Sequence, residues 1–180
     1  MLRPTLVAAM LVTAAAGIPA AQRQTQAPAF RLDKAAIVDQ ITNDGKRPLV
    51  AQNGMRFVWI KATALKTPQT IDLTKVEITG TPTKLPLVGV DSAFDGDPTQ
   101  FSMIAAERIK NGPLVQPMEE TKSDGKVEFA FTPGKTATLK FLTGTPSVCL
   151  LFAVFPGFTT GQVAGLGAAP LPVPALSPGR

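Results

Sequence analysis

The chain has 180 residues, of which 44% are hydrophobic and 17% charged, a balance typical of one globular domain rather than of a disordered or fibrous protein. It contains no His and no Tyr, so every mechanism that needs an imidazole base or a histidine metal ligand is excluded. The formal net charge is +5, but acids and bases are interleaved without a basic run, and we expect no nucleic-acid partner.

The first residues have the pattern of a secretory signal peptide. Arg3 precedes an apolar stretch over residues 6–16, which small residues follow. That stretch is shorter than the roughly 20 residues needed to cross a bilayer, which disfavours the alternative of a membrane anchor. We expect a signal peptide over 1–21, cleaved after Ala20 or Ala21, a secreted or periplasmic protein, and no stable membrane span after cleavage.

A flexible leader is expected next, over residues 22–33, because its polar beginning shows no hydrophobic periodicity. Residues 34–156 then follow a period of mostly two, which is typical of β-strands. Segments 36–41 and 55–65 are the first strand candidates. The second of these is rich in β-branched and aromatic residues, and its blurred alternation indicates a bulge.

The next elements are also short. Residues 71–79 alternate, but the parity changes between Leu73 and Val76, which predicts a bend. Segment 85–90 is a further strand candidate. Residues 102–110 fit a short helix or, nearly as well, a strand.

A hairpin is predicted from residues 126–131 and 136–141, which alternate cleanly around a Pro133-Gly134 turn. Residues 148–155 are apolar on both faces, as in a strand in the middle of a covered sheet. Short strands joined by Pro and Gly turns indicate an all-β antiparallel sandwich or small barrel.

The C-terminal residues 157–180 are rich in Gly, Ala and Pro, with Pro170, Pro172 and Pro174 at alternate positions. Proline has no amide to give to a ladder, so this segment is expected to be an extended or disordered tail outside the sandwich. A role as a spacer is favoured over a role as a ligand for an aromatic groove.

A partial resemblance joins several of these segments. Within 52–62 a glycine is followed by a phenylalanine and alternating β-branched residues, which resembles the opening strand of small immunoglobulin-like domains in exported bacterial proteins. The Pro133-Gly134 turn and strand 151–156 are similar to the closing half of such domains. The resemblance covers about 49–156 and implies an immunoglobulin-like β-sandwich that serves as a binding or structural module, with no catalytic residues.

Two single residues invite a functional reading. Cys149, the only cysteine, has no charged neighbour in sequence, so a buried hydrophobe is favoured over a reactive thiol. Trp59, the only tryptophan, is favoured as a core residue over a sugar-stacking platform, because a large ring dominates burial.

The sharpest local signal is a group of carboxylates around a glycine, Asp91, Asp95 and Asp97. Ca²⁺ seeks several oxygen ligands on a flexible turn, so these residues are candidate calcium ligands. The spacing lacks the pattern of an EF-hand loop, and Asp-Gly is also a common turn, so the ordinary turn is favoured.

No enzyme is predicted. A hydrolase triad cannot form without His, and the adjacent Glu119 and Glu120 would face opposite ways on an extended chain rather than across a sugar. The sequence therefore predicts an exported, non-enzymatic β-sandwich that binds a protein or cell-envelope partner through loops or a sheet edge, without a cofactor. The alternative is a calcium-dependent or carbohydrate-binding module.

Overall fold

The computed structural model describes residues 29–41, 49–51, 54–80, 83–91, 120–132 and 136–178. In these ranges the chain is mostly β-strand and includes the short 3-10 turn η2 (Leu73–Lys75), which confirms the predicted all-β class. The strands are β1 (Phe30–Val38), β2 (Gln40–Ile41), β3 (Leu49–Val50), β4 (Arg56–Ala64), β5 (Gln69–Asp72), β6 (Glu77–Gly80), β7 (Thr83–Asp91), β8 (Glu120–Ser123), β9 (Val127–Thr132), β10 (Thr136–Phe141), β11 (Ser147–Val154), β12 (Gln162–Ala164), β13 (Leu171–Pro172) and β14 (Leu176–Pro178).

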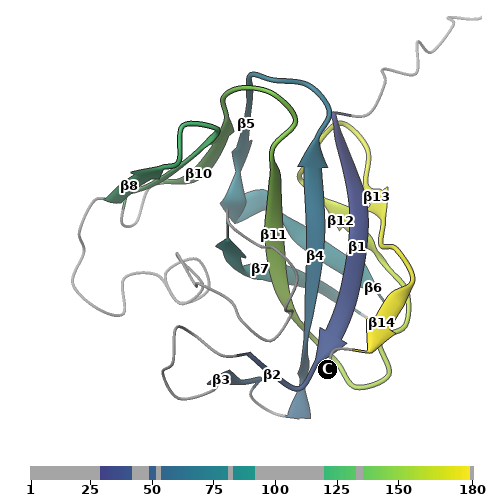
Figure 1. Cartoon of the computed structure of the whole chain (residues 1–180). Helices are drawn as coiled ribbons and strands as arrows, with labels where there is room; N and C mark the ends of the chain where they lie inside the picture. Colours follow the sequence, from purple (N-terminus) through teal and green to yellow (C-terminus); the bar gives the residue numbers. More distant parts are fainter. Residues whose placement is uncertain are drawn as a thin grey trace, which may run out of the picture.

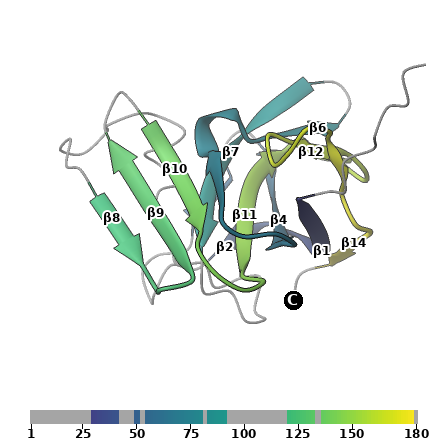
Figure 2. The same ribbon diagram turned by 90° about the horizontal axis from the view of Figure 1, so that it is seen from above.

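Two main sheets form a β-sandwich (Figure 1). The larger has the strand order β13-β12-β6-β7-β11-β4-β1-β14, and the smaller has the order β5-β10-β9-β8. Strands β2 and β3 form a separate short pair. Viewed from above, the larger sheet curls into a half-barrel, and the smaller sheet extends to one side (Figure 2). Neighbouring strands are antiparallel apart from β1 and β14, which run parallel.

The main core is built from alternate residues of both sheets, as the period of two requires. Phe152 on β11 and Phe129 on β9 are buried in the same cluster. Phe30 of β1 meets Phe141 of β10 edge to face, with ring centroids 5.0 Å apart, an arrangement that aromatic pairs favour. The aromatic pair therefore joins the two sheets directly.

A second buried cluster covers part of the opposite face of the larger sheet. Trp59 of β4 and Leu151 of β11 belong to it, and Ile41 of β2 packs there as well. Strand β11 is therefore buried on both faces and lies between β7 and β4, which confirms the predicted mid-sheet strand.

The predicted bend and hairpin are both present. The 3-10 turn η2 falls where the parity of residues 71–79 changes, and it carries the chain from β5 in the smaller sheet to β6 in the larger. Asp72 caps this turn by accepting a hydrogen bond from the Thr74 amide at 3.1 Å. Strands β9 and β10 pair in continuous antiparallel register.

The expected domain limits of 34–156 were wrong at both ends. Strand β1 begins at Phe30, inside the expected leader 22–33, because Phe30 is a core residue whose partner in β4 is Ala64. Phe30 and Leu32 both pack in the main core, and the bulge at Asp33 separates them from the alternation of the following residues.

The tail 157–180 was expected to lie outside the sandwich, and instead it supplies three strands of the larger sheet. β12 pairs with β6, β13 pairs with β12, and β14 pairs with β1. The alternating prolines permit this because residues of one parity direct their amides to one side of a strand. The Val173 amide donates to the Gly161 carbonyl at 2.9 Å. Prolines 170, 172 and 174 have the opposite parity, so the N–H groups that they lack would point to the other side of the strand.

Residues 171–178 connect the two ends of the larger sheet, and we call them the clasp. β13 forms one end of the strand order and β14 the other, with only 173–175 between them. Leu171, Val173 and Leu176 pack against the main core. Both ends of the sheet are therefore occupied by proline-containing strands, which protect a sheet edge from pairing with another chain.

Three expectations lie outside the described residues and stay predictions. They are the signal peptide 1–21, the helix or strand at 102–110, and the Pro133-Gly134 turn.

Candidate functional site

The outer face of β1, β4 and β11, which is the face turned away from the smaller sheet, changes character along the strands. At one end, Thr63 of β4 lies between its register partners Arg31 of β1 and Ser147 of β11. In the next outward row, Lys61 lies opposite Lys34. Beyond that row the face is apolar and buried. We call the polar end the polar patch, which consists of Arg31, Asp33, Lys34, Lys61, Thr63 and Ser147.

A β-bulge in β1 shapes this patch. The register with β4 passes from Leu32↔Ala62 directly to Lys34↔Lys61, which leaves Asp33 as the extra residue. A bulge breaks the alternation of faces, so residues 31 and 34 both take outward positions although their numbers differ by three. The blurred pattern of 55–65 had placed the bulge in β4, and the structure places it in the neighbouring strand.

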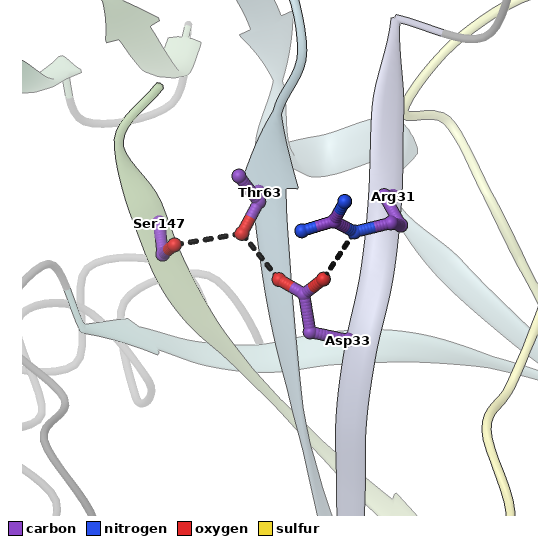
Figure 3. A network of polar contacts seen from close by, with 4 residues as sticks. All are labelled: Arg31, Asp33, Thr63 and Ser147. Carbon is purple, nitrogen blue, oxygen red and sulfur yellow. Dashed lines mark hydrogen bonds and ion pairs between the residues drawn. The ribbon is translucent and has the colours of Figure 1, made fainter. Parts of the chain in front are cut away.

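Four residues of the patch form a hydrogen-bonded network (Figure 3). The Asp33 carboxylate accepts from the Arg31 guanidinium through one oxygen and from the Thr63 hydroxyl through the other. The Ser147 hydroxyl lies 2.7 Å from that of Thr63. Thr63 has one proton and gives it to Asp33, so Ser147 is the donor in the second bond. The network thereby links β1, β4 and β11 through side chains.

The network holds Asp33 in its charged form. Partial burial acts to raise the pKa of Asp33, but hydrogen bonds from Thr63 and Arg31, together with the charges of Arg31 and Lys61, outweigh it and hold that pKa below its ordinary value. Such a carboxylate is a weak base. It also reaches Ser147 only through Thr63, so the arrangement suits fixing side chains in place rather than activating the serine as a nucleophile.

The two lysines of the patch lie beside this network. The Nζ of Lys34 is 5.7 Å from the centre of the Trp59 ring, within the range of a cation–π contact. Lys61 is half-buried, and its charge acts on Asp33. Neither ammonium group forms an ion pair within the part of the chain that the structure describes.

Of the three predicted calcium ligands, only Asp91 lies within the described residues. Asp91 ends β7, where its backbone pairs with Cys149, whereas Asp95 and Asp97 lie outside the described residues. Within the described ranges no cluster of three or more Cys, His, Asp or Glu could hold a metal ion. The calcium site stays a prediction.

The expectations for the two single residues are confirmed. Trp59 is 1% exposed and Cys149 is fully buried, both in the cluster on the outer face of the larger sheet. Neither side chain is accessible, so sugar stacking on Trp59 and surface reactivity of Cys149 have no support in this geometry.

Sequence reasoning missed the polar patch. Arg31 and Asp33 fell in the expected leader, and Lys34 at its border, while Thr63 and Ser147 are 84 residues apart and meet only through strand pairing. One signal was available. Lys61 interrupts an otherwise apolar segment, and a charged residue in a central strand marks a place where the sheet is not covered by apolar side chains.

No family model, curated protein or solved structure matches the chain. The resemblance of 49–156 to immunoglobulin-like domains is therefore still a prediction. In the parts of the chain described, no helix has the length and apolar character needed to span a membrane.

Proposed function

We propose that the protein is exported and acts as a non-enzymatic module that binds a protein or cell-envelope partner. The observation that carries this proposal is the polar patch, which presents charged groups from adjacent strands on a hydrogen-bonded, rigid sheet. Sites built on strands hold their geometry more exactly than sites on loops. Asp33 is a weak base, which favours binding over catalysis.

The sequence predicted that a partner binds through loops or a sheet edge, and the occupied ends of the larger sheet bear on this expectation. A sheet edge binds another chain through its unpaired amides and carbonyls. Here the clasp occupies both ends of that sheet. A partner is therefore expected on the outer face at the polar patch rather than as a strand added to the larger sheet.

Capture from a cell-envelope extract tests the proposal. The exported protein, purified after signal removal and immobilised, should retain a specific component in the presence of a chelator, and that component should rebind in purified form at a fixed stoichiometry. Retention that is equal on a heat-unfolded control, or is lost with the chelator, would contradict the proposal. So would turnover of ester or glycoside substrates by the purified protein.

A further inference from the structure

We propose that Lys34 and Lys61 form a binding site for a tetrahedral oxyanion, a phosphate or sulfate group, carried by the partner of the preceding section. The inference rests on that proposed function, because it names the chemical group that the outer face would recognise. The carrier most consistent with a compact site on an exported protein is an acidic envelope polymer.

The first argument is the placement of like charges. Lys34 and Lys61 are register partners on adjacent antiparallel strands, and both occupy outward positions. Side chains directly opposite one another have Cβ atoms about 5 Å apart, and like charges in such a pair destabilise the sheet. An anion that lies between the two ammonium groups would relieve this repulsion.

The second argument is that, within the described ranges, neither lysine has the carboxylate partner that Lys75, Lys84 and Lys140 have. Lys75, Lys84 and Lys140 lie 3.2, 2.7 and 2.6 Å from the carboxylates of Asp72, Glu77 and Glu128. Lys34 and Lys61 have no such ion pair among the described residues.

The nearby Asp33 carboxylate feels the charge of Lys61 but forms no ion pair with Lys34 or Lys61 among the described contacts. Both oxygens of Asp33 are engaged, one by Arg31 and the other by Thr63. Arg31 and Asp33 compensate each other in charge, so the two ammonium groups remain as the excess charge of the patch. Lys34 is exposed and Lys61 half-buried, so a ligand can approach from solvent while part of the site is shielded from water.

The chemistry favours a phosphate or sulfate group. Lysine binds phosphate as a compact point charge with three donors, and a tetrahedral group offers oxygens to two ammonium groups at once. The Ser147 and Thr63 hydroxyls lie at the adjacent row of the same face. Trp59, being buried, offers no stacking surface, so the site recognises charge rather than a sugar ring.

Titration of the exported protein with inorganic phosphate, followed by calorimetry and by the melting temperature, tests the site. Lys34→Gln and Lys61→Gln should each weaken phosphate binding by about tenfold or more, and the double variant should lose the phosphate-induced rise in melting temperature. Lys66→Gln is the matched control, because it removes the same charge from an exposed residue outside the patch, and it should bind as the wild type does.

Two outcomes would overturn the inference: no phosphate binding by the wild type, or equal binding by all variants. Lys34 is exposed, so Lys34→Gln should fold even if Lys61→Gln does not, and it keeps the test decisive. Affinity that is unchanged by added NaCl would also contradict a site based on two ammonium groups.

A second arm distinguishes the source of the anion. A soluble phosphorylated polysaccharide should bind more tightly per phosphate than inorganic phosphate, and the same polymer without phosphate should not bind. Binding of inorganic phosphate alone would assign the site to the free ion. If envelope capture occurs but is indifferent to Lys34 and Lys61, this inference fails while the proposed function stands. If phosphate binds but nothing is captured, the proposed function fails while the site stands.

Discussion

At the scale of single residues, Thr63 does most to organise the polar patch. It is the only polar side chain among the buried residues described, with 7% of its surface exposed. Its hydroxyl donates to Asp33 and accepts from Ser147, so one group satisfies neighbours on two other strands. Removing this hydroxyl deletes a hydrogen bond to the charged Asp33 and takes an acceptor from Ser147, which is itself partly buried.

Thr63→Val, which keeps the shape of the side chain, should lower the free energy of unfolding by about 1–2 kcal/mol at pH 7. The pKa of Asp33 is lower in the folded protein than in the unfolded chain. The stabilisation that ionised Asp33 contributes is therefore fully present above its pKa in the unfolded chain, and is lost as the pH falls through its pKa in the folded protein. The difference between variant and wild type should therefore shrink below about pH 4. Urea unfolding at pH 7 and pH 3 measures both values.

Thr138→Val is the control for that experiment. The Thr138 hydroxyl donates to the Ala130 carbonyl at 3.5 Å, a long bond to a group that does not titrate. Removing this hydroxyl should lower the free energy of unfolding by less than Thr63→Val does, and the change should be the same at pH 7 and pH 3. An equal, pH-independent loss in both variants would show that Thr63 acts through packing alone.

Burial of single residues was predictable from the sequence, but their polar contacts were not. Trp59 was placed in the interior because a large ring dominates burial, and Cys149 because it has no charged neighbour in sequence, and both placements are confirmed. The contact between Asp33 and Thr63 depends on a bulge that shifts the register by one residue. No local pattern specifies which strand of a pair carries such a bulge.

At the scale of elements, a glycine allows the turn that follows β12 to pack against η2. Gly165 has a φ of +87°, and a Cβ there would lie 2.8 Å from the Lys75 carbonyl carbon. Both the left-handed backbone and the close approach to η2 therefore exclude a side chain.

A series of Gly→Ala variants separates these two effects. Gly144→Ala, with a φ of +69° and no atom within 4 Å of its Cβ, should cost about 1 kcal/mol. Gly167→Ala, with open space and no positive φ, should change stability by no more than about 0.5 kcal/mol. Gly165→Ala should exceed Gly144→Ala by about 1 kcal/mol or more, because overpacking adds to strain. Chemical denaturation gives the order, and equal losses at Gly165 and Gly144 would contradict the close approach.

Elements were predicted well where local pattern and tertiary role agree. The β9–β10 hairpin and the bend at η2 follow from alternation and its change of parity. β12, β13 and β14 were missed because a segment rich in Gly and Pro resembles a linker in composition. Their strand character comes from partners, β6 and β1, that are far away in sequence.

At the scale of the whole molecule, the clasp determines how the larger sheet ends. A curled sheet with two free ends would expose unpaired groups on β1 and β12. The clasp covers both with one continuous segment, and Leu171, Val173 and Leu176 anchor it to the core. Ser177 adds a hydrogen bond from its hydroxyl to the Ala35 carbonyl at 3.1 Å.

Truncation after Pro170 should therefore destabilise the protein by about 3 kcal/mol, since three partly buried apolar side chains contribute about 1 kcal/mol each. It should also promote self-association, because the edges of β1 and β12 become free to pair. Denaturant unfolding and sedimentation at several protein concentrations measure these effects. Leu176→Asp should reproduce part of the loss, whereas Ala175→Asp, at an exposed position between β13 and β14, should not. A truncated protein that stays monomeric and as stable as the full chain would show that the sheet holds its curl without the clasp.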